Sequence, residues 1–462
     1  MNNNNFIINK RIFNSIIISI LYLFSSLTTA IELDTTSKES ICNALTLVLD
    51  GTFNYYEGFK YGGTIGMFTP PYYWWEAGEA WGGIIDTWYF CQNDTWEQVI
   101  MDALLHQVGK GNDYIPANQS MTEGNDDQAF WGLAVMGATE RNFTNPPSDQ
   151  PQWLALTQAV YNTMWARWDS ANCDGGLRWQ IFTWNSGYNY KNTISNGCLL
   201  HIAARLARYT GNETYVDTAT TVWDWLANDV DFLVLENDAY KVYDGADIGD
   251  GNCSKITKIQ WSYNAGIVMA GCAYLYDFTN DTQWLTRTNQ LFNGINIFFT
   301  DNIMYEQFCQ PRNTCNNDQR SFKSVFSRCL GMTAKMVPSL HDKIMTLLTD
   351  SAVAAAQSCS GGTDGHTCGL AWNYNGWDGY YGLGEQISAL EVMNNLLLDD
   401  RPGPFTNRTG GSSQGNADAG LDSKIVTNPN EITVDNGDKA GAGIITAIVL
   451  IVLISICFWM LL

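Results

Sequence analysis

The chain has 462 residues, of which 47 are acidic and 25 are basic, so its formal net charge at pH 7 is −22. This excess of acid argues against a nucleic-acid partner, because binding to a phosphate backbone relies on lysine and arginine. Aromatic residues make up 13% of the chain, which suits a protein that stacks sugar rings and equally one with a large aromatic core.

The first 30 residues have the features of a secretory signal peptide. Lys10 and Arg11 precede an apolar run over residues 16–27, and small residues end the segment at Ala30. We expect cleavage after Ala30 and export into a compartment where disulfides form.

The other end of the chain predicts a lipid anchor. Residues 444–462 carry no charge, and no basic residue follows them as it would on the cytoplasmic side of a retained span. Asn436, Gly437 and Asp438 precede this tail, so the pattern favours a GPI-attachment signal over a permanent span, with residues 438–462 as the removed propeptide. Residues 399–437 are rich in Gly, Ser and Asn, which predicts a disordered stalk.

Seven Asn-x-Ser/Thr sequons predict a glycosylated surface. They are Asn93, Asn118, Asn142, Asn212, Asn252, Asn280 and Asn407.

Eleven of the twelve cysteines lie in the exported part, so disulfides are expected and one thiol is left over. Short loops could be closed between residues 309 and 315 and between residues 359 and 368, all cysteines. Cys198 and Cys272 lie in Ala-rich helical segments and are expected to be buried free thiols.

Residues 39–398 show helical periodicity and little strand alternation. Six segments combine an aromatic, polar loop with a Gly- and Ala-rich helix, and they begin at Pro71, Gly124, Tyr188, Trp261, Arg320 and Asp378. Amphipathic helices are predicted between them at 39–56, 95–108, 152–168, 214–228, 283–299 and 339–358. Since helices that are apolar all round belong inside and striped helices outside, the pattern predicts a closed (α/α)6 barrel. An open solenoid is the alternative, but its repeats of roughly 34 to 47 residues are shorter than the spacing here.

A closed barrel would gather the loops before the inner helices at one rim, where they would form a cleft. The residues expected to line it are Trp74, Trp75, Glu76, Asp126, Asp127, Tyr188, Asn189, Tyr263, Asn264, Trp377, Asp378 and Tyr380.

Asp126 and Asp127 are the candidate catalytic residues. Asp126, at a helix start, is expected to accept backbone hydrogen bonds and stay ionised, whereas Asp127 beside it should have a raised pKa and keep its proton. Two carboxyls with different pKa values are what glycoside cleavage requires, and neighbouring side chains approach to about the 5–5.5 Å of a retaining enzyme. Such a run is more often a simple helix cap, but the adjacent Phe130 and Trp131 favour a sugar site.

Other polar patterns are weaker. Glu76 and Glu79 lie one helical turn apart and could bind sugar hydroxyls, although surface carboxylates with this spacing are common. Asp244, Asp247 and Asp250 miss the spacing of an EF-hand, so we predict a turn. The four histidines show no metal-ligand spacing and no phosphate loop or nucleophile elbow is found, so neither a metal nor a cofactor is expected.

Five segments carry a resemblance to a known family: YYWWEAGEAWGG, EGNDDQAFWG, GGLRWQIFTWNSGYNYKNTISN, CNNDQRSFKSVFSR and GWDGYYGLGEQISALEV. They closely resemble the fungal GPI-anchored members of glycoside hydrolase family 76, the mannan endo-1,6-α-mannosidases of cell-wall assembly. The resemblance covers nearly the whole chain. It implies an (α/α)6 barrel and a retaining mechanism in which Asp126 is the nucleophile and Asp127 the general acid/base.

The resemblance also implies a biological role. The enzyme would cleave within the α-mannose core of the GPI glycan on other proteins and transfer the glycan to wall β-glucan, at the outer face of the plasma membrane and in the cell wall. The alternatives are a catalytically silent mannan-binding protein and a structural wall glycoprotein. The intact aspartate pair favours the enzyme over the first, and a large packed domain with a polar rim argues against the second.

Overall fold

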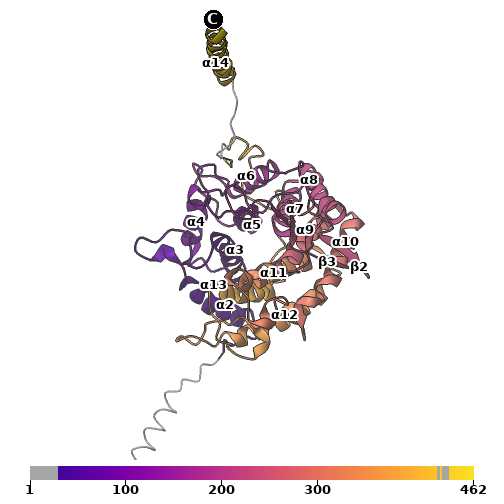
Figure 1. Ribbon diagram of the computed structural model, residues 1–462. Helices are drawn as coiled ribbons and strands as arrows, with labels where there is room; N and C mark the ends of the chain where they lie inside the picture. Colours follow the sequence, from indigo (N-terminus) through magenta and orange to yellow (C-terminus); the bar gives the residue numbers. More distant parts are fainter. Residues whose placement is uncertain (1–29, 424–426, 429–435, 462) are drawn as a thin grey trace, which may run out of the picture.

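The computed structural model describes residues 30–423, 427–428 and 436–461, so residues 1–29 of the expected signal peptide lie outside the described part. Within it, six helices form an inner ring. They are α3 (Trp74–Cys91), α5 (Asn125–Glu140), α7 (Thr193–Thr210), α9 (Ser262–Thr279), α11 (Asn317–Met336) and α13 (Leu383–Asn394). Each packs against the next, and α13 packs back against α3, which closes the ring (Figure 1).

The outer layer consists of the amphipathic helices that alternate with the inner ones. They are α2 (Lys38–Phe53), α4 (Glu97–His106), α6 (Trp153–Trp165), α8 (Thr214–Asp224), α10 (Thr282–Gly294) and α12 (His341–Ser358). Each outer helix packs on an inner neighbour, so the predicted (α/α)6 barrel is confirmed.

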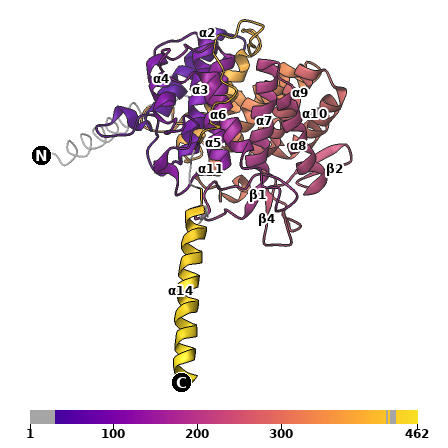
Figure 2. The same cartoon turned by 90° about the horizontal axis from the view of Figure 1, so that it is seen from above.

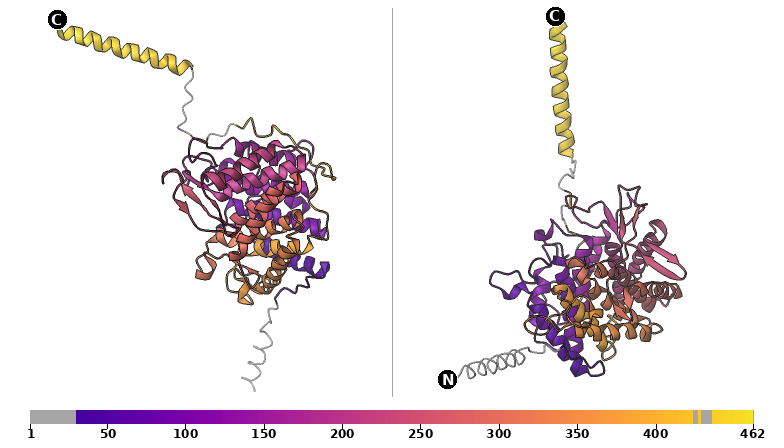
Figure 3. Two further views of the ribbon diagram at one scale, coloured as in Figure 1. Left: turned by 90° about the vertical axis from the view of Figure 1, so that its right-hand side faces the viewer. Right: turned by 60° about the horizontal axis from the view of Figure 1, so that its bottom comes forward.

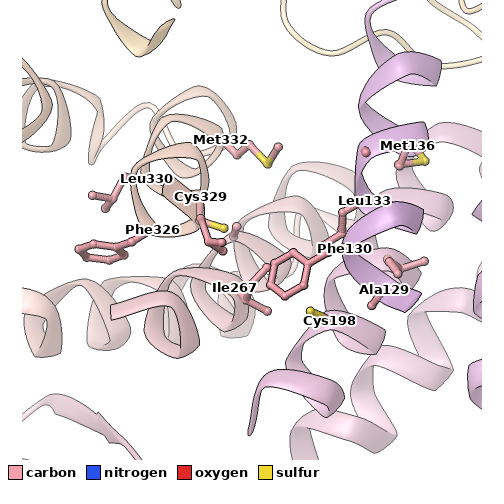
Figure 4. Close-up of a cluster of buried hydrophobic side chains, with 14 of the residues drawn as sticks. Ala129, Phe130, Leu133, Met136, Cys198, Ile267, Phe326, Cys329, Leu330 and Met332 are labelled. Atoms are coloured by element: carbon pink, nitrogen blue, oxygen red, sulfur yellow. The ribbon is translucent and has the colours of Figure 1, made fainter. Parts of the chain in front are cut away.

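The inner helices pack closely because they are rich in glycine. A Cβ on Gly78 of α3 would lie 2.9 Å from the Trp131 ring of α5, and one on Gly266 of α9 would lie 3.0 Å from Phe326 of α11. Figure 4 shows Phe130, Cys198, Ile267 and Cys329 converging from four inner helices on the barrel core, whereas Phe326 points away from them. The small residues that marked these helices in the sequence therefore act as contact points.

In the part of the chain that the structure describes, three small sheets lie beside the barrel helices. β1 (Tyr190–Asn192) pairs antiparallel with β4 (Gly245–Asp247), which pairs with β5 (Ile256–Thr257), and this sheet lies at the start of α7. The other two are hairpins, β2 (Leu233–Glu236) with β3 (Ala239–Val242) and β6 (Phe299–Thr300) with β7 (Ile303–Met304). Of the three acidic residues predicted to form a turn, Asp250 lies in one, whereas Asp247 belongs to β4 and Asp244 directly precedes that strand.

Buried ion pairs fill the end of the barrel where the inner helices finish. Arg205 Nη2 lies 2.7 Å from Glu140 Oε2, Arg141 Nε lies 2.8 Å from Asp86 Oδ1, and Arg328 Nη1 lies 3.0 Å from Glu79 Oε2. Only about 20 Å³ of space remains among these side chains. Glu79 is therefore a buried structural carboxylate, which corrects the expectation that Glu79 could reach a sugar from the surface.

The structure contains the disulfides Cys42–Cys91, Cys173–Cys253, Cys309–Cys315 and Cys359–Cys368, which confirms the two short loops. Cys198 and Cys272 are buried free thiols, as predicted. Cys329 is a third buried free thiol, so the exported part of the described chain leaves three thiols rather than one.

Residues 403–423 form an ordered C-terminal strap, which corrects the prediction of disorder from residue 399 onward for this part. The strap hydrogen-bonds to the barrel, for example from Phe405 N to Glu140 O at 2.9 Å. Its glycines permit the contact, because a Cβ on Gly411 would lie 2.4 Å from the Tyr209 hydroxyl and one on Gly415 would lie 2.7 Å from Gln158 Oε1. A Gly- and Ser-rich composition is typical of flexible segments. In this protein the small residues instead allow the strap to pack closely against the barrel.

Beyond the strap lies the apolar helix α14 (Asn436–Leu461). Its segment Lys439–Trp459 is long and apolar enough to cross a membrane, and none of that window is buried against the protein. Figure 3 shows α14 apart from the helical body in two views.

Candidate active site

A cavity of about 440 Å³ opens at the end of the barrel where the inner helices begin, a volume within the usual range for ligand sites. It is lined by the starts of α3, α5, α9 and α11 and by the loop before α7. The lining residues are Tyr73, Trp75, Met121, Thr122, Asp126, Asp127, Phe130, Trp179, Gln180, Asn185, Ser186, Tyr190, Asn192, Asp244, Trp261, Tyr263, Asn316, Asp318, Gln319 and Phe322.

Asp126 and Asp127 lie together in this lining, in the first turn of α5. The carboxylate of Asp127 reaches back and accepts a hydrogen bond from the backbone N–H of Gly124. Asp126 Oδ2 accepts a hydrogen bond from Trp179 Nε1 at 3.1 Å. The loop that carries Trp179 is itself fixed to the helix start, since Asn125 N donates to Trp179 O at 2.7 Å.

The two aspartates differ in acidity. Burial raises the pKa of Asp126 to about 7, although the surrounding backbone N–H groups and the Trp179 indole oppose this rise. Burial and the neighbouring charge of Asp126 raise the pKa of Asp127 well above its ordinary value. The prediction that Asp127 has a raised pKa agrees with this, whereas the prediction that Asp126 keeps an ordinary, low pKa is wrong because Asp126 is buried as well. At pH 7 Asp126 is therefore about half ionised, whereas Asp127 keeps its proton.

A third carboxylate, Asp318 at the start of α11, lies in the same cavity. It accepts a hydrogen bond from Trp75 Nε1 at 2.9 Å, and burial raises its pKa. Its charge in turn raises the pKa values of both Asp126 and Asp127. A fourth, Asp244, accepts a hydrogen bond from the Tyr190 hydroxyl at 2.7 Å. No lysine or arginine belongs to the cavity lining formed by the described residues.

Aromatic rings supply the apolar wall. Tyr263 and Phe322 stack with their centroids 3.8 Å apart, and Trp261 meets Phe322 edge to face at 5.4 Å. Trp75 packs against Phe130 at 4.8 Å. Rings beside carboxylate and amide oxygens are the usual lining of a sugar site, where apolar faces stack and hydroxyls donate hydrogen bonds.

Of the twelve residues expected in the cleft, Trp75, Asp126, Asp127 and Tyr263 line the cavity. Three others are buried outside the lining. Trp74 donates to Gln107 Oε1 at 3.0 Å, and Glu76 accepts hydrogen bonds from Tyr73 N and Ser321 Oγ at 2.8 Å each. Asn264 is buried in the first turn of α9.

The remaining five expected residues lie in loops outside the lining, which corrects that part of the prediction. Arg178 stacks over Tyr188 and donates to Asn189 Oδ1 at 2.9 Å. Asp378 holds its own loop together by accepting from Ala371 N at 2.8 Å and Tyr380 N at 3.1 Å. Trp377 donates to Tyr380 O at 2.6 Å.

Sequence reasoning missed Trp179, Tyr190, Asp244 and Asp318. A signal existed for Asp318, because Asn316-Asn317-Asp318 stands at an inner-helix start just as Asn125-Asp126-Asp127 does. The other three come from loops before α7 and α9, whose positions depend on the β1–β4–β5 sheet. Among the described residues no cluster of three or more His, Cys, Asp or Glu side chains is arranged to hold a metal ion.

The model of glycosyl hydrolase family 76 matches residues 40–408. The chain belongs to glycoside hydrolase family 76. The mannan endo-1,6-alpha-mannosidase DFG5 of Saccharomyces cerevisiae is 58% identical over 452 residues, which are 96% of this chain and 98% of that protein. DCW1 of the same yeast, also named a mannan endo-1,6-alpha-mannosidase, is 57% identical and covers 94% of this chain and 96% of its own.

Solved structures of the family share the barrel. Dfg5 from Chaetomium thermophilum in complex with glucosamine has a TM-score of 0.80 and 39% identity, covering 85% of this chain and 98% of that one. A family 76 α-1,6-mannanase of Salegentibacter has a TM-score of 0.62 over 78% of this chain and 99% of its own. That structure is of an inactive variant, with two adjacent aspartates replaced by asparagine, in complex with α-1,6-mannotriose. At 17% identity this second likeness shows the fold alone.

Proposed function

We propose that this protein is a retaining glycosidase or transglycosidase that acts on α-1,6-linked mannose-containing glycans. The observation that carries the proposal is the aspartate pair in an aromatic cavity, with one carboxyl that ionises near pH 7 and a neighbour that holds its proton. The names of the close relatives supply the substrate class. The Salegentibacter variant, inactive without two adjacent aspartates, is consistent with this assignment.

The proposed reaction has two steps. Asp126 attacks the anomeric carbon while Asp127 gives its proton to the departing glycosidic oxygen, so that an ester to Asp126 forms as the glycosidic bond breaks. Water or an acceptor hydroxyl then attacks the same carbon, Asp127 takes the proton, and the ester is broken with Asp126 released as a carboxylate. The hydrogen bond from Trp179 supports the ionised form of Asp126 at the start and end of this cycle.

The finer part of the proposal concerns donor, acceptor and location. The donor is the mannose-containing core of a GPI glycan, the acceptor is wall β-glucan, and the protein is held at the outer face of the plasma membrane by its own GPI anchor. The apolar helix α14, preceded by Asn436, Gly437 and Asp438, supports the anchor. The seven sequon asparagines are exposed or half-exposed, which supports glycosylation during export.

The test uses a secreted chain that ends at Asn428 and so keeps the strap. It is incubated with an α-1,6-mannooligosaccharide, with and without a β-glucan oligosaccharide, and the products are read by mass and by the anomeric signals in proton NMR. A retained anomer or a mixed oligosaccharide is expected. Inversion would refute the role of Asp126, and binding without turnover would favour the silent mannan-binding protein.

A further inference from the structure

The C-terminal strap begins and ends at opposite ends of the barrel. The last inner helix, α13, finishes at the end filled by the buried ion pairs, and there Phe405 N donates to Glu140 O at the end of α5. Without further contacts the chain would leave the barrel on this side, far from the cavity. The strap instead carries the chain along the outer helix α6 toward the cavity.

Hydrogen bonds trace this path. Near the start of α6, Leu154 N donates to Ser413 Oγ at 3.0 Å. Near its end, Asn162 Nδ2 donates to Ala417 O at 2.8 Å and Ala419 O at 2.9 Å. Ser423 Oγ then donates to Asp113 Oδ2 at 2.9 Å, in the loop that precedes α5.

The strap's continuation meets the rim of the cavity. Thr183 N donates to Thr427 O at 3.0 Å, and Thr183 Oγ1 donates to the same oxygen at 3.2 Å. Thr183 belongs to the loop whose residues Trp179, Gln180 and Asn185 line the cavity. Figure 2 shows the same relationship, because α14 stands on the side of the molecule where β1 and β4 lie.

We propose that the strap is an orienting device that turns the cavity mouth toward the membrane to which the chain is attached. The tether between Asn428 and Asn436 consists of seven residues, and its eight Cα-to-Cα steps span at most about 29 Å when fully extended. The inner helices set the height of the barrel, and the 18 residues of α3 correspond to about 27 Å. Even fully extended, this tether is only about as long as the barrel is high, so the mouth side is the side held nearest to the point of attachment.

The end of the barrel that carries the cavity mouth therefore faces the outer leaflet of the membrane and the glycans attached to that leaflet. The chain leaves from the mouth side whether α14 is kept as a span or exchanged for a lipid anchor, because both attach the chain after residue 435. An anchor glycan would lengthen the tether without changing the face from which it leaves. The substrate part of this inference rests on the proposed function, since a cavity turned to the membrane suits a donor glycan that is itself membrane-bound.

The test measures orientation on the full-length anchored protein in phosphatidylcholine vesicles that carry a headgroup acceptor dye. A donor dye is attached at Lys255→Cys, in the exposed hairpin beside β5 on the mouth side, or at Ser339→Cys, in the exposed loop between α11 and α12 at the filled end. Both sites are exposed, so each serves as the other's control. We expect energy transfer at least twofold more efficient from position 255 than from position 339. Equal transfer from the two, or stronger transfer from position 339, would overturn the proposal.

A second variant inserts 30 Gly and Ser residues after Asn428. A flexible segment of this length has an average end-to-end distance of about 30 Å, so the difference between the two labels should largely disappear. The same preparations are assayed on a soluble α-1,6-mannooligosaccharide. Absence of turnover there would refute the proposed function while the energy-transfer result still decides the orientation.

Discussion

The indole N–H of Trp179 donates a hydrogen bond to Asp126 Oδ2 at 3.1 Å and thereby joins the loop before α7 to the proposed nucleophile. This bond stabilises the ionised carboxylate and lowers its pKa against the effect of burial. Trp179→Phe keeps an aromatic wall and removes the donor. We expect the acidic limb of the pH–rate profile to move to higher pH and the rate at pH 6 to fall about tenfold, the size of one lost charge-assisted bond.

Trp184→Phe is the matched control for this prediction. Trp184 also donates an indole hydrogen bond, to Ser120 O at 3.0 Å, but it does not belong to the cavity lining. If both variants show the parent profile, Trp179 has no part in setting the acidity of Asp126.

The roles of the two aspartates can be separated by the leaving group. Asp126→Ala removes the nucleophile and should abolish turnover of every α-mannoside. Asp127→Ala removes the proton donor, so it should lose oligosaccharide cleavage but still release a leaving group that needs no proton, such as dinitrophenolate, in one burst. Both variants should keep the circular dichroism of the parent. Turnover of oligosaccharide at the parent rate by either variant would show that the assigned residue is not catalytic.

The raised pKa of Asp126 also predicts a pH-dependent cost in stability. The folded protein binds more protons than the unfolded chain between the ordinary pKa near 3.8 and the folded value of about 7, so this group makes stability fall as pH rises through that window. Asp126→Asn removes the titration. We expect it to stabilise the protein at pH 8 by roughly 2 kcal/mol, about half of the full conversion of the pKa difference, because Asp126 keeps partial exposure to the water of the cavity. Thermal unfolding at pH 4 and pH 8 measures this, and a gain of equal size at both pH values would contradict it.

The sequence predicted the parts of this structure that are encoded locally. The six Gly- and Ala-rich helices could be recognised because each one is small and apolar over a whole segment, and ring closure follows from their number. Asp126 and Asp127 could be paired because they are neighbours in the chain.

Residues that long loops bring to the cavity could not be predicted from local sequence patterns. Asp244 reaches the cavity only because β4 pairs with β1, and Trp377 and Asp378 use their polar atoms inside their own loop. The strap was misread for a related reason, since the composition of residues 403–423 does not show that Gly411 and Gly415 lie against Tyr209 and Gln158.

A substitution at Asp318 can change the pKa values of Asp126 and Asp127 without altering either of these two residues. Its negative charge raises the pKa values of Asp126 and Asp127, so Asp318→Asn should lower both. The side-chain amide oxygen still accepts the Trp75 hydrogen bond, which keeps the geometry. We expect both limbs of the bell-shaped pH–rate profile to move to lower pH, by about half a pH unit or more. The exposed Asp250, outside the lining, gives the control variant Asp250→Asn, and an unmoved profile for Asp318→Asn would refute the electrostatic coupling.

The strap should stabilise the barrel as well as redirect the chain. A side chain on Gly411 would lie 2.4 Å from the Tyr209 hydroxyl and 2.8 Å from Thr406 O, so Gly411→Val must push the strap off the end of α7. We expect a loss of about 1–3 kcal/mol in the free energy of unfolding, in the range of other overpacked contacts, together with faster proteolysis within residues 403–423. Gly403→Ala is the control, because a Cβ there would meet its nearest neighbour, Lys335 Cε, at an ordinary 3.7 Å. Equal protease resistance of the two variants would mean that the strap is held by its other contacts and that Gly411 is not required for its packing.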